Sequence, residues 1–172
     1  MEKARIAFEV DGFLSLLQME LDSFATLMAA GLVRKAGHSQ YYAAYNACCA
    51  LLASLGIKTE SHAGAQSMIS LHFVKSGKLP RDTGAKLNAL MGQRHAIDYH
   101  AEVEIGYDEV AVNHAWLMEF VGSILKLVEE SKLASKNSLA AARRALQGAR
   151  TLPPRRAGLV PQAPTPEKKR HP

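Results

Sequence analysis

The stretch YYAAYNACCALLA, residues 41–53, decides the fold of this 172-residue chain. Asn46 carries its only strongly polar side chain, so the stretch is apolar or aromatic on every side of a helical wheel. A helix of this kind is buried among other elements instead of lying on a surface. The sequence therefore predicts a central helix that begins near Ser39 and stops at Gly56, at the core of a helical bundle.

Apolar residues also recur every three or four positions before and after this central helix, which is the spacing of one helix face. The preceding helix ends at Gly31 as a C-cap, and the following helix ends at a turn that contains Gly77 and Pro80. Their apolar faces consist of Leu14, Leu17, Leu21, Phe24, Ala25 and Met28 in the first helix, and of Ala65, Met68, Ile69, His72 and Phe73 in the third.

Two more helices complete the predicted bundle. Asp82 is a suitable N-cap for the fourth helix, which falters near Tyr99, and a fifth helix begins at about Asp108. Five amphipathic helices with short connections predict an all-α bundle. The last two apolar stripes consist of Leu87, Leu90, Met91 and Ile97 in the fourth helix, and of Leu117, Phe120, Val121, Ile124, Leu127 and Val128 in the fifth.

Composition is typical of an ordinary soluble protein, with 48% hydrophobic and 22% charged residues. No run reaches the ~18 uncharged apolar residues of a membrane span, and the N-terminus has acidic residues where a secretory signal has its apolar core. We therefore expect a cytoplasmic protein without a membrane partner. The adjacent Cys48 and Cys49 are too few for a structural zinc site and are expected to be reduced, buried thiols.

Charge divides the chain into two parts. Residues 1–131 contain 11 basic and 15 acidic residues, whereas residues 132–172 contain 10 basic residues and only Glu167. We expect a helical domain over 1–131 and a basic tail after it, in which 132–149 has good helix formers that could prolong the fifth helix. Residues 151–172 hold six of the seven prolines and are expected to be disordered.

The arginines of this tail have three open interpretations. They can contact RNA phosphates without reading sequence, neutralise the acidic domain, or bind a partner protein. The residues concerned are Arg143, Arg144, Arg150, Arg155 and Arg156.

Arg94 stands out because it lies within the apolar stripe of the fourth helix, not opposite it. A permanent cation on a packed face costs several kcal/mol unless it is paired or faces a site. Asp98, four residues later, is the structural explanation: the two can form a buried ion pair in a helical protein whose role is only to bind other proteins. The alternative is a functional site around Arg94.

The segment from Arg94 to His100 resembles the R-x4-6-H signature of HEPN domains, with five intervening residues and His95 at the position that is usually polar in that family. Residues 39–47 resemble the Tyr- and Ala-rich helix of the family, and residues 72–80 its following turn. The resemblance covers roughly residues 10–130.

This resemblance implies a homodimer whose facing fourth helices bring two Arg/His sets into one cleft. It implies metal-independent RNA cleavage without a cofactor, by a toxin or an antiviral defence effector. The implied partners are RNA and either a nucleotidyltransferase antitoxin or a larger defence-system protein. The alternative is a non-catalytic HEPN module that binds a nucleotide or scaffolds a toxin–antitoxin or defence complex.

Within the implied site, His100 is the general acid/base and Arg94 the phosphate clamp, with His95, Asp98 and Tyr99 as supporting residues. Histidine titrates near neutral pH and arginine offers a fixed forked cation, which suits attack by an RNA 2′-hydroxyl. On a regular helix the two would lie ~9 Å and ~120° apart. We therefore expect the helix to end near Tyr99, or the site to be completed across a two-fold axis.

Overall fold

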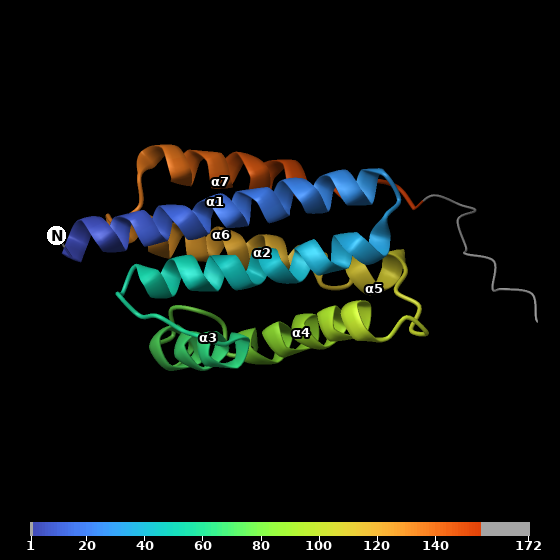
Figure 1. Cartoon of the computed structure of the whole chain (residues 1–172), viewed down its shortest axis with the longest axis horizontal. Helices are drawn as coiled ribbons and strands as arrows, with labels where there is room; N and C mark the ends of the chain where they lie inside the picture. The colour runs from blue at the N-terminus through green and yellow to red at the C-terminus, as the bar shows by residue number, and fades with distance from the viewer. Residues whose placement is uncertain (1, 156–172) are drawn as a thin grey trace, which may run out of the picture.

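The computed structural model describes residues 2–155, and within them the chain is all-α, as predicted (Figure 1). It has more helices than the five expected, because the third helix continues as a π-helical turn, the fifth is divided in two and residues 136–149 form a separate helix. The elements are α1 Glu2–Ala29, α2 Val33–Ala53, α3 His62–Ile69, the π-helical turn η1 Ser70–Val74, α4 Thr83–Tyr99, α5 Tyr107–Ala111, α6 His114–Glu130 and α7 Lys136–Ala149. None of these helices is long and apolar enough to cross a membrane.

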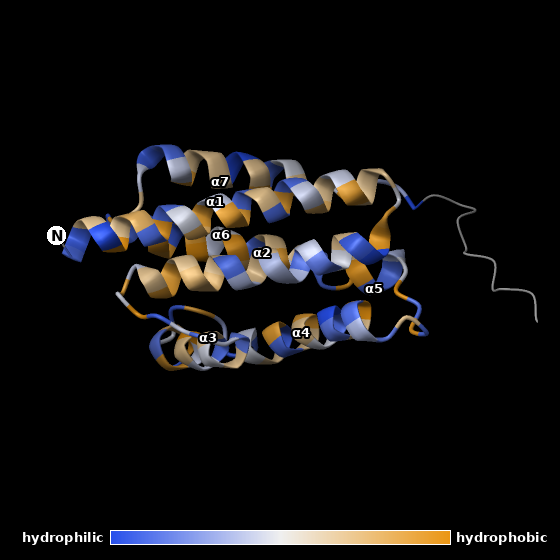
Figure 2. Cartoon of the chain, in the orientation of Figure 1, coloured by the Kyte–Doolittle hydropathy of each residue, from blue (hydrophilic) through white to orange (hydrophobic). Residues whose placement is uncertain are grey.

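The central position predicted for α2 is confirmed. Fifteen of its 21 residues are buried, and it contacts α1, α3, α4, α5 and α6. Figure 2 shows apolar colours along the end of α2, whereas α1 and α7 alternate between apolar and polar. The strongly apolar composition therefore does place this helix in the core.

The start of α2 differs from the prediction near Ser39, since the helix begins at Val33. Gly31 has a φ of 77° and reverses the chain, so the helix resumes almost at once. Burial begins at Ala36 and Gly37, where the glycine lets α4 come close: a Cβ at Gly37 would lie 2.6 Å from Cδ1 of Ile97. The predicted start missed this turn because its packing partners come from α4.

Asp82 occupies the N-cap position of α4, as predicted, but its side chain makes no capping hydrogen bond. Its carboxylate instead lies 3.0 Å from Lys86 Nζ. The end of α4 at Tyr99 confirms the predicted break.

The predicted fifth helix is two helices, α5 and α6, with a break at Val112 and Asn113. Side chains from other helices hold this break. The buried Gln40 amide donates to Val110 O over 2.9 Å, and Asn113 Nδ2 donates to Gln93 Oε1 over 3.2 Å. The long apolar stripe of α6 alone did not reveal the interruption.

Segment 132–149 contains a separate helix, α7, and does not prolong α6 as the sequence allowed. Lys132 adopts a φ of 58° and turns the chain, and Ser135 then caps α7 by accepting a hydrogen bond from Ser138 N. The helix packs on α1 with five buried residues, Leu139, Ala142, Ala145, Leu146 and Ala149. It is thus part of the packed bundle. Most of 151–172, where disorder was predicted, lies outside the described residues.

Candidate functional site at the end of helix α4

The chain leaves the helical conformation at His100, whose φ and ψ are −124° and 81°. A residue that sequence reasoning missed, Arg34 at the start of α2, holds this end in place. Arg34 Nη2 donates to the carbonyl oxygens of Ala96, Ile97 and His100 over 2.8–3.0 Å, and its Nη1 donates to Val103 O over 2.6 Å. Two of these carbonyls, those of Ala96 and His100, also accept a backbone hydrogen bond, so Arg34 adds a charged donor to the turn that follows the helix.

No local sequence pattern predicts this role, because Arg34 is 62 to 69 residues away from the carbonyls to which it donates. Its effect is to fix the turn that carries His100. The position of that histidine therefore depends on α2 as well as on α4.

Arg94 lies on the inner side of α4 and faces α2. Its Nε is 2.7 Å from Asp98 Oδ2, and its Nη2 donates to the Tyr42 hydroxyl over 3.2 Å. The guanidinium also lies over the rings of Tyr42 and Tyr99, at 5.7 and 5.8 Å. Only 20% of the side chain is exposed. Burial opposes the charge, but Tyr42, Asp98 and Tyr99 outweigh it and raise the pKa of Arg94.

The ion pair with Asp98, the structural explanation offered by the sequence, is therefore present. Asp98 has a second neighbour in His38, whose Nε2 lies 3.8 Å from Asp98 Oδ1. The His38 ring packs on Tyr42 with centroids 4.6 Å apart. Arg94 and Asp98 are thus held together by two side chains of α2.

His100 lies outside this packed set, with 47% of its side chain exposed. Its Nδ1 is 3.0 Å from Glu102 Oε1. A hydrogen bond from the backbone of Glu102, together with the one to His100, holds the pKa of Glu102 below its usual value. An exposed imidazole with a carboxylate on one nitrogen keeps its other nitrogen available for proton transfer.

Arg94 and His100 do not touch, but Tyr99 and His95 lie between them. The Arg94 guanidinium is over the Tyr99 ring, which packs on the His95 ring at 4.8 Å, and the His95 ring is 5.5 Å from that of His100. The structure thus brings together all five residues that the resemblance marked around Arg94, with the cation on the inner side of the helix and the imidazole on the outer side.

A further group of aromatic residues, which sequence reasoning did not connect to Arg94, lies behind it. The Tyr41 hydroxyl is 2.7 Å from His62 Nδ1, and the Tyr45 ring packs on His62 at 4.2 Å. Burial lowers the pKa of His62, and the nearby Arg94 charge lowers it further. His62 is the first residue of α3, and its ring joins α3 to the tyrosines of α2.

Three of the arginines marked in the tail pair with acidic residues of the bundle. The pairs are Arg143 with Glu129 at 2.7 Å, Arg150 with Glu119 at 2.9 Å and Arg155 with Asp108 at 3.1 Å. Arg144 is exposed, and Arg156 lies outside the described residues. This arrangement matches the interpretation in which the basic segment neutralises the acidic domain.

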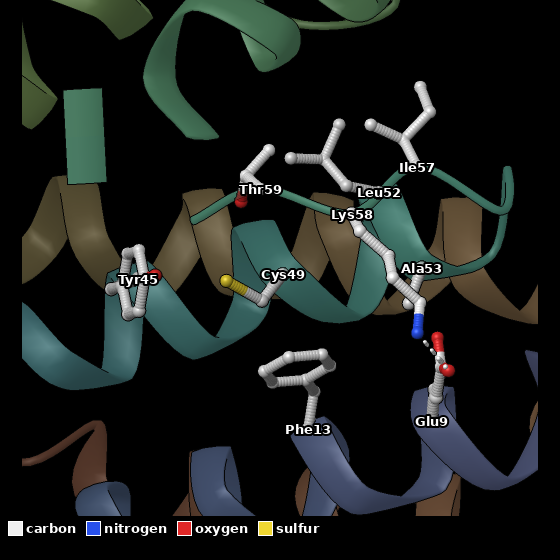
Figure 3. Close-up of a pocket in the computed structure, with 9 residues that line it drawn as sticks. All are labelled: Glu9, Phe13, Tyr45, Cys49, Leu52, Ala53, Ile57, Lys58 and Thr59. Atoms are coloured by element: carbon white, nitrogen blue, oxygen red, sulfur yellow. Dashed lines mark ion pairs between the residues drawn. The ribbon is translucent and has the colours of Figure 1, made fainter. Parts of the chain in front are cut away.

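A cavity lies elsewhere in the described chain, between α1, α2 and the α2–α3 connection (Figure 3). It has a volume of about 340 Å³ and is lined by Glu9, Phe13, Tyr45, Cys49, Leu52, Ala53, Ile57, Lys58 and Thr59. Burial raises the pKa of the Cys49 thiol to about 11, so this thiol is not a ready nucleophile. Within residues 2–155, no three histidine, cysteine or acidic side chains lie close enough to hold a metal ion.

The fold and this helix end define an all-α bundle with an Arg/His cluster. The chain is similar to two proteins named UPF0332. The one from Thermotoga maritima is 29% identical over 117 residues, which are 66% of this chain and 86% of that protein. The one from Pyrococcus horikoshii is 36% identical over 73 residues, 42% of this chain and 51% of that protein. No protein-family profile matches the chain.

Proposed function

We propose that the protein is a metal-independent endoribonuclease of the HEPN type that acts as a homodimer. The observation that carries the proposal is the break of α4 at Tyr99. It places the exposed imidazole of His100 and the guanidinium of Arg94 at one helix end, linked through Tyr99 and His95. The resemblance of residues 94–100 to the R-x4-6-H signature gives this pair its chemical interpretation.

The proposed reaction is cleavage of RNA by its own 2′-hydroxyl. The His100 imidazole accepts the hydroxyl proton, the 2′-oxygen attacks phosphorus, and the 5′-oxygen leaves with a proton, which yields a 2′,3′-cyclic phosphate. The Arg94 guanidinium stabilises the negative charge that develops on the phosphate oxygens. Its contacts to Asp98 and Tyr42 use Nε and Nη2, so the proposal assigns Nη1 to the phosphate.

The homodimer rests on the outer face of α4. This face is exposed and carries small side chains along most of its length, which lets a second helix approach closely. In a two-fold pairing of these outer faces, the two exposed His100 imidazoles border one cleft, and each Arg94, on the inner side of its helix, meets that cleft past the Tyr99 ring at the helix end. The exposed residues of the face are Ala85, Asn88, Ala89, Gly92, His95 and Tyr99.

The proposed biological role is that of a toxin or defence effector, with a nucleotidyltransferase antitoxin or a larger defence protein as partner. The decisive experiment incubates the purified protein with single-stranded RNA, with and without EDTA, and analyses the ends of the products. We expect cleavage in both conditions and 2′,3′-cyclic or 3′-phosphate ends. A protein that leaves RNA intact, alone and with its natural partner, would instead be the non-catalytic module.

A further inference from the structure

Residues 61–81 contain no aspartate or glutamate, although the first 131 residues are acidic overall. The end of this segment carries Lys75, Lys78 and Arg81, and all three side chains are exposed. Among the described residues none of the three forms an ion pair, in contrast to Arg143, Arg150 and Arg155. The nearest acidic residue in the sequence, Asp82, is paired with Lys86. We call these three cations the basic corner.

The backbone of the basic corner is fixed by hydrogen bonds and by a buried leucine. Gly77 turns the chain with a φ of 75°, and its N–H donates to Val74 O. Leu79 is buried, and its N–H donates to Phe73 O over 3.0 Å. Lys78 Nζ lies 5.9 Å from the centre of the Phe73 ring. Because the loop is already ordered, binding an anion here does not require the backbone to become ordered first.

The basic corner lies just before α4, whereas Arg94 and His100 lie at its other end (Figure 1). The 17 residues of α4 rise ~25 Å along the helix axis. A single strand that contacts both places must extend over several nucleotides, which is within the ~4–16 nucleotides that one single-strand-binding domain covers. The corner is thus too far away to act on the same phosphate as His100 of its own chain.

We infer that Lys75, Lys78 and Arg81 form a second RNA-contacting site, which binds backbone phosphates several nucleotides from the cleaved bond. This inference rests on the proposed function for the identity of the polyanion. The contacts are to phosphates, so they add affinity without base preference. The described tail arginines are a weaker choice for this role, since three of them already have carboxylate partners.

The test measures RNA binding by fluorescence anisotropy in the full chain, with His100→Ala present to prevent cleavage. The test variant adds Lys75→Gln, Lys78→Gln and Arg81→Gln. The matched control adds Lys3→Gln, Lys126→Gln and Lys136→Gln, which remove the same charge from three exposed lysines without ion pairs in the described chain. The probes are a 12-nucleotide and a 3-nucleotide single-stranded RNA of the same base composition, titrated at several salt concentrations.

We expect the test variant to bind the 12-mer more weakly, with the slope of log affinity against log salt shallower by roughly 2, the value for three lost phosphate contacts on a single strand. Its binding of the 3-mer should equal that of the control. Circular dichroism and thermal unfolding verify that both variants are folded. Unchanged 12-mer binding, an equal loss in the control, or an equal loss with the 3-mer would overturn the inference. So would binding of polyglutamate as tightly as of the 12-mer.

The same measurements separate this inference from the proposed function. Loss of 12-mer binding in the test variant, together with an inert wild-type protein, would support the basic corner and reject the ribonuclease. Cleavage by the wild type with full 12-mer binding by the test variant would reject the basic corner and leave the ribonuclease standing.

Discussion

At the scale of single residues, Arg94 has to satisfy two roles with one side chain. Its Nε and Nη2 contact Asp98 and Tyr42, and the proposed mechanism assigns Nη1 to a phosphate. Arg94→Ala leaves a carboxylate that is only 21% exposed without its main partner, which should cost about 1–3 kcal/mol of unfolding free energy. Urea unfolding of Arg94→Ala, Asp98→Ala and the double variant measures the pair. If the two effects simply add, the ion pair contributes nothing to stability.

Arg94→Lys tests the other role. A lysine can keep the charge near Asp98, but its ammonium cannot reproduce the guanidinium fork that contacts Asp98 and Tyr42 and, in the proposed mechanism, a phosphate at the same time. We expect stability close to that of the wild type and RNA cleavage well below it. Full cleavage by Arg94→Lys would show that only a point charge is needed.

In the proposed mechanism His100 contributes to catalysis but little to stability, because its ring is half exposed and packs little. His100→Ala should reduce the rate of RNA cleavage by ~100–10,000-fold, the usual contribution of a general acid or base. Its melting temperature should remain that of the wild type. His72→Ala removes another exposed histidine, from η1, and is the control that should cleave normally. A fully active His100→Ala would remove this residue from the mechanism.

The sequence was sufficient to predict the Arg94–Asp98 pair, because the two residues are four positions apart on one helix. It was not sufficient for Arg34, Tyr42 or His62. These residues reach Arg94 or the end of α4 only through the packing of α2 and α3 against α4, and contacts over such sequence separations have no local pattern.

At the scale of the helices, the contact between Arg34 and the end of α4 determines where His100 stands. Arg34→Ala removes four hydrogen bonds to carbonyls in residues 96–103. We expect faster amide hydrogen exchange in residues 100–103 and slower RNA cleavage, although Arg34 is not placed against the substrate. Lys35→Ala, an exposed neighbour, is the control. Unchanged exchange in that turn would mean that other contacts hold it.

The close approach of α2 and α4 at Gly37 can be tested against a second helical glycine. A Cβ at Gly37 would meet Ile97, Gln93 and Val110 at 2.6–3.3 Å, whereas a Cβ at Gly12 would meet nothing within 4 Å. Gly12→Ala should raise the free energy of unfolding by ~0.5–1 kcal/mol through helix propensity. Gly37→Ala should lower it, and adding Ile97→Val should restore part of the loss. Chemical denaturation measures all three, and equal gains at both glycines would contradict the close packing.

At the scale of the whole molecule, the sequence predicted a helical bundle but did not assign residues 136–149 to it. The basic character of 132–149 suggested a tail, yet Leu139, Ala142 and Leu146 recur at helical spacing and are buried against the rest. In the fold, the basic residues of this segment also join it to the bundle, because Arg143 and Arg150 form ion pairs with acidic residues of α6. Such pairing depends on how two helices lie beside each other, which segment-by-segment reading does not specify.

The proposed dimer is the remaining property of the whole molecule, and it can be separated from the fold. We expect sedimentation of the wild type to show a dimer at micromolar concentration. Gly92→Arg places a long cation on the outer face of α4, where a Cβ meets nothing within 4 Å of its own chain. It should therefore leave the fold intact, produce a monomer and reduce RNA cleavage.

The matched variant Gly12→Arg adds the same side chain at a helical glycine of α1, whose Cβ position is equally open. It should remain a dimer and cleave RNA, since α1 lies on the other side of α2 from α4 (Figure 1). A monomeric wild type that still cleaves RNA would require one chain to supply the whole site. Arg94 would then have to reach the phosphate from the inner side of its own helix while His100 acts from the outer side, and the break at Tyr99 alone would have to bring them together.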